Sequence, residues 1–214
     1  MKEKKKLGLG RIFMRTFAYD NIVLTQALGL CPIIAAGVSL KRGLALTVCT
    51  AAVMIPCSLL MATVGKRLSA VVRAPLYAVL ATALMVGCAF LLTTYVSPEL
   101  YASLYLFLPL VSVNTLFTYH AGGFSAGRTP LQALFDALGT SCGFGVVICV
   151  VSALREMAIA GKVFGIPLPY EARFPEAAYP FTAFILLGFM AAFMQHIRNR
   201  RLHNENGKEE LLNE

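Results

Sequence analysis

The polar residues of the chain are gathered into short clusters, and long uncharged segments separate these clusters. No Asp, Glu, Lys or Arg occurs in residues 43–65, 74–98 or 100–127. A helix of about 20 apolar residues crosses the hydrocarbon core of a bilayer. Each of these segments is therefore long enough to contain a membrane-spanning helix.

The same pattern predicts six spans joined by short loops. They are Ile22–Leu40, Gly43–Val64, Ala74–Val96, Leu100–Tyr119, Pro130–Ala153 and Ala177–Met194. We expect an all-α integral membrane protein with one membrane domain over residues 20–195. A basic, amphipathic N-terminal segment (residues 1–19) precedes this domain on the cytoplasmic side, and a charged cytoplasmic tail (residues 196–214) follows it.

Two of the six predicted spans contain residues that interrupt a helix. The first span has Gly29, Cys31 and Pro32 near its middle, and the fourth has Pro109 followed by the polar Asn114. Each interrupted span opens a group of three, and because three is odd, the second group enters the membrane from the opposite face. This predicts two inverted three-helix repeats whose paired breaks mark a functional site at the bilayer midplane. The alternative is an ordinary proline kink in each helix.

Composition and charge agree with this interpretation. Hydrophobic residues make up 57% of the chain and charged residues only 14%, against about 25% in soluble domains. With the N-terminus inside, fourteen of the 19 Lys and Arg residues lie in cytoplasmic segments, as the positive-inside rule requires. We expect a multi-pass protein of a prokaryotic cytoplasmic membrane with both termini inside. The net charge of +8 then reflects membrane orientation, because no nucleic-acid-binding motif accompanies it.

The N-terminal segment has the pattern of an amphipathic helix. Leu9, Ile12 and Phe13 fall near one helical face, with Arg11 and Arg15 beside them. This predicts a helix lying on the anionic cytoplasmic leaflet. A frayed basic tail is the alternative.

All six cysteines lie inside predicted spans, which excludes a disulfide framework in the loops. Five of them are surrounded by apolar residues and are interpreted as small buried side chains. Cys31 differs, because the first break presents its thiol on a segment expected to be unwound. A lone cysteine does not hold a metal centre, so any cluster needs further ligands from this chain or from a partner.

Other polar residues in the spans have more local interpretations. Gly139 and Gly143 form a small-x-x-x-small pattern that lets helices approach closely. Asp136 is either functional, as intramembrane carboxylates usually are, or near enough to the membrane surface to reach water or Arg128. Arg155, with Glu156 beside it, closes the fifth span and is interpreted as an interface anchor.

The segment from Asp20 to Gly37, DNIVLTQALGLCPIIAAG, resembles the opening of the Rnf/Nqr membrane-subunit family, with its N-x-V-L-x-x-x-L-G-L-C-P signature. The segment LYLFLPLVSVNT is similar to the second conserved break of that family. ALREMAIAGKVFGIPLP is similar to its R-E-x-x-x-x-G-x-x-F-G stretch. The resemblance extends to Met194. The basic N-terminus and the inside termini are similar to those of RnfE/NqrD-like members, whose inverted partners are the RnfA/NqrE-like members.

The resemblance implies a membrane subunit of a redox-driven, ion-translocating electron transport complex. Such complexes transfer electrons between reduced ferredoxin and NAD(+) (Rnf type) or from NADH to quinone (Nqr type). They couple this transfer to the movement of Na(+) or H(+) across the membrane. The chain is then part of a translocase and performs no catalysis alone. In the family, two inverted homologous subunits are thought to share one 2Fe-2S cluster, to which each subunit contributes two cysteines from its helix breaks.

By this resemblance, Cys31 is a candidate ligand of the cluster. The second ligand of the family follows an asparagine in the fourth span, and here the corresponding pair is Asn114-Thr115. The second cysteine is therefore absent. Three interpretations stay open: a subunit with a substitute ligand at Thr115, a cluster-less structural paralogue of the family, and a secondary carrier with the same inverted repeat.

Overall fold

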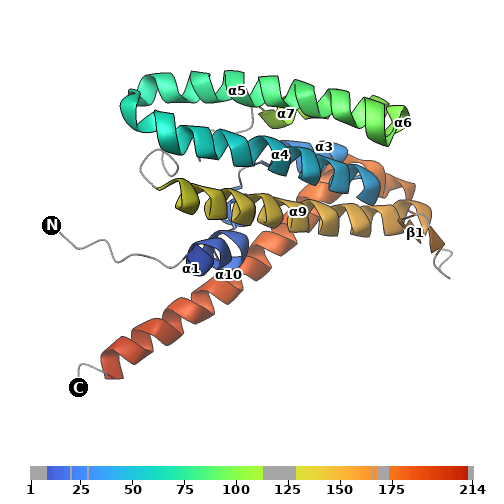
Figure 1. The fold of residues 1–214 in the computed structure, drawn as a ribbon. Helices are drawn as coiled ribbons and strands as arrows, with labels where there is room; N and C mark the ends of the chain where they lie inside the picture. The colour runs from blue at the N-terminus through green and yellow to red at the C-terminus, as the bar shows by residue number, and fades with distance from the viewer. Residues whose placement is uncertain are drawn as a thin grey trace.

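The computed structural model of the chain describes residues 9–19, 21–27, 29–112, 129–164, 166–167 and 174–211. Within these ranges four helices are long and apolar enough to cross a membrane. They are α4 (Leu40–Val64), α5 (Ala70–Leu91), α9 (Pro130–Ala160) and α10 (Pro180–Leu211). Figure 1 shows α4, α5 and α9 side by side, whereas α10 runs obliquely to them and projects from the body.

The four long helices confirm the second, third, fifth and sixth predicted spans as helices, although several ends differ. The third span finishes as a π-helix, η3 (Leu92–Val96). α9 continues past Ala153 to Ala160, because Gly161 (φ 60°) is the residue that ends it in a left-handed conformation. α10 continues past the apolar segment into the charged tail, so residue 195 is not a helix end.

The first and fourth predicted spans are each divided into two short helices in the described part of the chain. The first consists of α2 (Ile22–Gln26) and α3 (Leu30–Ala36), and the fourth of α6 (Pro98–Leu104) and α7 (Phe107–Ser112). Residues 113–119 of the fourth span lie outside the described residues. The six predicted spans thus correspond to four long helices and two divided ones.

α4 and α9 form the centre of the fold and run antiparallel. Small residues let their backbones approach: a Cβ atom at Gly43 would lie 2.8 Å from Oγ of Ser152, and one at Gly145 would overlap with the side chain of Thr47. In a membrane, such close approach gains dispersion energy that large side chains would prevent. The core around this pair is apolar, with Leu46, Val53, Phe144, Ile148 and Val151 all at most 1% exposed.

The N-terminal segment forms α1 (Leu9–Met14) and a π-helical turn, η1 (Arg15–Tyr19), and both contact α9. Ile12 is 3% exposed, so an apolar side of this helix faces α9. At Gly139 an added Cβ would lie 2.9 Å from the carbonyl oxygen of Phe13. The predicted role of Gly139 and Gly143 in close packing is confirmed. The amphipathic helix packs on α9, and its position on the cytoplasmic leaflet stays a prediction.

The connection from α9 to α10 contains the strands in the described part. β1 (Lys162–Val163) pairs antiparallel with β2 (Ile166–Pro167), and a 3-10 turn, η6 (Pro175–Ala178), precedes α10. The all-α expectation holds for the membrane domain, and this short hairpin is an addition to it. Pro180 begins α10 because a proline fits the first turn of a helix.

Candidate functional site

The first break, between α2 and α3, is built from two residues with left-handed backbone conformations. Ala27 has φ 54° and Gly29 has φ 82°. A glycine adopts a positive φ without steric cost, whereas an alanine does so less readily. The chain therefore changes direction before Cys31, not at it.

Cys31 and Pro32 lie in the first turn of α3, which corrects the expectation that the thiol lies on an unwound segment. A proline is tolerated there because the first N–H groups of a helix have no intrahelical acceptor. The thiol of Cys31 is exposed, as is that of Cys142 on α9, whereas Cys49 and Cys57 are buried. The exposed Cys31 is thus accessible to a group outside the chain.

Asn21 fixes the start of the first half-helix. Its side-chain oxygen accepts a hydrogen bond from the N–H of Val23 at 3.1 Å, and its amide nitrogen donates to the carbonyl oxygen of Gly143 at 3.2 Å. Asn21 is 4% exposed, so it connects α2 to α9 inside the protein. Asn21 opens the N-x-V-L signature in the sequence, and an asparagine directly before an apolar run is also a signal for a helix N-cap, a role that we did not assign to it from the sequence.

The second break lies at Tyr105 and Leu106, between α6 and α7. Pro109, which we expected to interrupt this span, is instead the third residue of α7. Pro32 is likewise the third residue of α3. In the first span Gly29 lies at the break, as predicted, whereas Cys31 and Pro32 follow it. In the fourth span the predicted break at Pro109 is too late, because a first-turn proline permits a helix to begin before it.

The two breaks belong to neighbouring half-helices, since α3 contacts α7. The last long helix of each predicted three-span group, α5 or α10, contacts the divided helix of the other group. α5 packs on α7, whereas α10 packs on α2 and α3. Each divided helix is therefore covered by the last helix of the other half, and α4 and α9 lie together at the centre (Figure 1).

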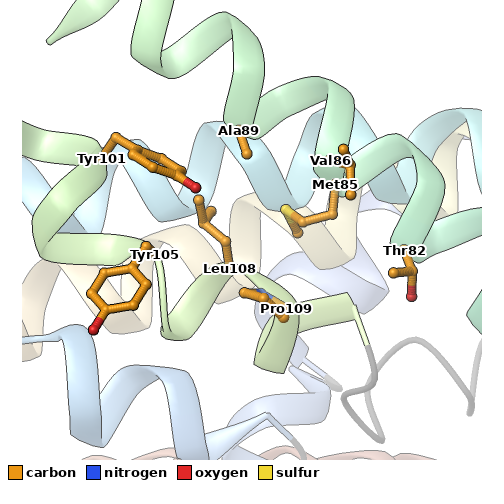
Figure 2. Close-up of a pocket in the computed structure, with 8 residues that line it drawn as sticks. All are labelled: Thr82, Met85, Val86, Ala89, Tyr101, Tyr105, Leu108 and Pro109. Carbon is orange, nitrogen blue, oxygen red and sulfur yellow. The ribbon is translucent and has the colours of Figure 1, made fainter. Parts of the chain in front are cut away.

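An apolar cavity of about 160 Å³ lies where α5 crosses the second break. Figure 2 shows Tyr101 and Leu108 on one side of this cavity and Met85 on the other. A second apolar cavity, of about 230 Å³, lies where α10 crosses the first break and is lined by Ala27 and Leu30 among others. These linings offer shape and hydrophobic contact rather than groups for bond chemistry.

Arg155 is the largest fully buried side chain of the described residues, with 1% of its surface exposed. Its guanidinium group donates hydrogen bonds to backbone carbonyl oxygens at two places, the end of α3 and the start of α10. The acceptors are the carbonyl oxygens of Ile34 (2.9 Å), Gly37 (3.1 Å), Ala177 (3.0 Å), Ala178 (2.6 Å) and Tyr179 (3.3 Å). The planar guanidinium group has five N–H donors and can therefore reach carbonyl oxygens at both places. The ammonium group of a lysine has three donors at a single point and cannot replace it.

Glu156, the next residue along α9, binds the other side of the turn between α3 and α4. Its carboxylate accepts a hydrogen bond from the N–H of Leu40 at 2.6 Å, at the N-terminus of α4. A carboxylate is favourable there because the first N–H groups of a helix are unpaired and carry partial positive charge. We expected Arg155 and Glu156 to be anchors at the interface, and the structure shows that together they hold the turn between α3 and α4.

Asp136 is 2% exposed, so its carboxylate does not reach water in this structure. One of its oxygens accepts a hydrogen bond from Oγ1 of Thr16 at 2.8 Å, and Thr16 lies in η1. The N-terminal segment therefore covers this carboxylate. Arg128, the other neighbour that we considered, lies outside the described residues.

The described residues do not by themselves form a metal site. Within them, no group of three or more His, Cys, Asp or Glu side chains is positioned to hold a metal ion. A 2Fe-2S cluster takes four thiolate ligands, so Cys31 fits only as one ligand of a cluster that other groups complete. Asn114 and Thr115 lie outside the described residues.

Comparison with known proteins places the chain among membrane subunits. The profile of a family described as "Rnf-Nqr subunit, membrane protein" matches residues 9–191. A relative from Clostridium ljungdahlii is named as the E subunit of a proton-translocating ferredoxin:NAD(+) oxidoreductase complex. It is 26% identical over 212 residues, which cover 94% of this chain and 99% of the relative.

Two further relatives are named as E subunits of ion-translocating oxidoreductase complexes. One, from Aliivibrio fischeri (strain MJ11), is 28% identical over 205 residues, which cover 89% of each protein. The other, from Shewanella sp. (strain ANA-3), is 33% identical over 145 residues, which cover 68% of this chain and 62% of the relative.

Proposed function

The chain belongs to the Rnf-Nqr family of membrane subunits, and from this premise we propose that it is the RnfE-type subunit of an Rnf complex. In such a complex, electron transfer between reduced ferredoxin and NAD(+) drives ion movement across the membrane. The observation that carries this proposal is the similarity to the clostridial E subunit over 99% of that relative's length. The chain acts as one part of a translocase and performs no catalysis alone.

The arrangement of the helices supports a site at the paired breaks. We infer that the chain is an inverted repeat in which α2–α3, α4 and α5 correspond to α6–α7, α9 and α10. Two observations support this: each divided helix is covered by the last helix of the other half, and α3 and α7 both have a proline as their third residue. Broken backbone inside a membrane is stable only where protein or a cavity shields its polar groups.

For localisation, we propose a cytoplasmic membrane with both termini inside. The positive-inside distribution of Lys and Arg supports this orientation. α9 then ends at the outer face, and the turn held by Arg155 and Glu156 lies there too. The N-terminal helix, with α9 beside it, lies at the inner face.

The partner that we propose is an inverted homologous subunit, RnfA-like, within the same complex. The exposed thiol of Cys31 supports a 2Fe-2S cluster shared with that partner, and such a cluster would supply one-electron transfer. The threonine at position 115 and the single thiol at the breaks support the second candidate, a subunit that keeps the fold and the pairing without a cluster.

Co-purification tests the proposed function. A tagged chain, extracted from its own membranes in mild detergent, should carry the other subunits of the complex with it, identified by mass spectrometry. The preparation should reduce NAD(+) with reduced ferredoxin. A chain that purifies without partners and takes up a solute when reconstituted alone would instead be a secondary carrier, and the proposal would be wrong.

A further inference from the structure

The end of the molecule where α9 finishes and α10 begins carries a group of exposed apolar side chains. We call them the loop patch: Phe164 (50% exposed), Ile166 (70%), Phe174 (56%), Tyr179 (62%) and Phe181 (54%). The patch comes from the β1–β2 hairpin and from the residues on either side of η6. Tyr179 and Phe181 stack on each other, with ring centroids 6.4 Å apart.

The conformation of Phe164 makes its exposure unusual. This residue has φ 55°, in the left-handed region that bulky side chains avoid. The strained backbone displays a phenylalanine at the tip of the hairpin, where half of its surface remains uncovered. Exposure of the ring to water is unfavourable, so an apolar neighbour would stabilise this arrangement.

The backbone around the patch is held firmly, so the patch is a fixed surface. The N–H of Phe174 donates to the carbonyl oxygen of Ala158 in the last turn of α9, at 2.9 Å. Arg155 holds the carbonyl oxygens just before α10, including that of Tyr179. Phe174 and Tyr179 are therefore held beside the end of α9 and the start of α10.

Positive charges lie beside the patch. Nζ of Lys41 is 5.9 Å from the centre of the Phe164 ring, and Lys41 and Lys162 are both exposed. α9, which is long and apolar enough to cross a membrane, ends at Ala160, and α10, which is as well, begins at Pro180. The patch thus combines exposed aromatic rings with flexible cations where one candidate span ends and the next begins. Aromatic rings and lysines at the ends of spans bind the headgroup region of a bilayer.

We propose that the loop patch inserts into the headgroup region of the surrounding membrane and that phospholipid is its partner. The aromatic rings lie between the headgroups and the upper acyl chains, and the ammonium groups of Lys41 and Lys162 lie near lipid phosphates. Through Arg155, this anchor also fixes the end of α3. The loop patch therefore ties the outer end of the first divided helix to the membrane surface.

Photo-crosslinking in native membranes tests this proposal. Phe164 is replaced by the photoreactive amino acid p-benzoyl-phenylalanine, in the full chain within the membranes that contain its complex and with lipids labelled by radioactive phosphate. Phe189, which is 72% exposed in the middle of α10, is the positive control, and Phe144, which is 1% exposed, is the negative control. All three replacements exchange one aromatic ring for another.

We expect irradiation to attach labelled phospholipid to the Phe164 variant with a yield within about twofold of that at Phe189, and to give none at Phe144. The same replacement at Tyr179 gives a second measurement if the hairpin variant does not accumulate. Attachment of Phe164 to another protein in place of lipid, or no attachment while Phe189 is labelled, would overturn the proposal. Neither result depends on electron transfer, so the proposed function is tested separately.

Discussion

At the scale of single residues, Arg155 shows how a buried charge is accommodated in this fold. The acceptors described for it are backbone carbonyl oxygens at the end of α3 and the start of α10. The last carbonyl groups of a helix are unpaired and carry partial negative charge, so a cation there satisfies several of them together. Backbone carbonyl groups at two places in the fold thus stabilise this charge.

We predict that Arg155→Lys is not conservative. A lysine keeps the positive charge but loses the planar fork, so several buried carbonyl oxygens lose their donors. We expect a loss of about 2 kcal/mol or more in stability, which corresponds to a melting temperature lower by about 5 °C. The measurement is the thermal transition of the purified complex, followed through this subunit. Arg67→Lys, at an exposed position, is the matched control; equal stability of the two variants would refute the role of the fork.

We predict a further difference at the residue scale between the two exposed thiols, Cys31 and Cys142. If the complex holds a 2Fe-2S cluster at the breaks, Cys31→Ser lowers its iron and acid-labile sulfide, whereas Cys142→Ser leaves them unchanged. A threonine hydroxyl is a poor iron ligand beside a thiolate, so Thr115→Cys raises iron occupancy. The measurement is iron and sulfide per complex after subtraction of the clusters of the soluble subunits. Equal iron in the native and Cys31→Ser complexes would show that Cys31 is not a ligand.

At the scale of elements, packing of the N-terminal helix against α9 depends on glycines in α9. Added side-chain atoms at Gly139 would meet the backbone of Phe13, and those at Gly143 would meet the amide of Asn21. The hydrogen bond between Thr16 and Asp136 lies at the same contact. The contact is therefore sensitive to bulk on α9.

We predict that Gly139→Leu releases the N-terminal helix from α9, because the leucine occupies the space of the Phe13 backbone. Amide hydrogen exchange of residues 9–19 should become at least about tenfold faster. Gly87→Leu on α5 is the matched control, since a Cβ there meets nothing within 4 Å. Unchanged exchange in the Gly139 variant would mean that the helix is held elsewhere.

Hydropathy was sufficient to predict the existence of the long helices but not their ends, and it did not predict the β1–β2 hairpin. The four long helices were readable because a membrane selects for length and low charge. The end of α9 could not be predicted from hydropathy. Arg155 and Glu156 end the apolar run in the sequence, but the helix continues past them because both side chains form hydrogen bonds within the protein. Gly29 lies at the first break, but Pro32 and Pro109 were misplaced for a local reason: each stands in the first turn of a half-helix and does not interrupt it.

At the scale of the whole molecule, the contacts that define the site could not be predicted from the sequence. The contact of Arg155 with Ile34 joins residues 121 positions apart, and that of Thr16 with Asp136 joins residues 120 apart. No local pattern encodes such pairs. The sequence did show that a helix break opens each group of three spans. Broken backbone inside a membrane must be shielded by protein or by a cavity, so the repetition indicated that the two breaks belong to one site.

The inverted halves that we propose require a particular topology, which a reporter experiment tests. We predict that a reporter active only in the cytoplasm works at either terminus and after Arg67, and fails near Ser97, because α5 crosses the membrane between these two positions. The fusions after Arg67 and at Ser97 control for each other, since both follow a complete helix. Activity at Ser97 would contradict both the orientation and the inverted halves.

The central claim is that this chain couples electron transfer to ion movement as the RnfE-type subunit of an Rnf complex. The most direct measurement compares inverted membrane vesicles from cells with the chain, without it, and with it restored, supplied with reduced ferredoxin and NAD(+). We predict that NAD(+) reduction and the accompanying ion uptake are both lost without the chain and both return with it. Undiminished NAD(+) reduction and ion uptake in vesicles that lack the chain would contradict the account.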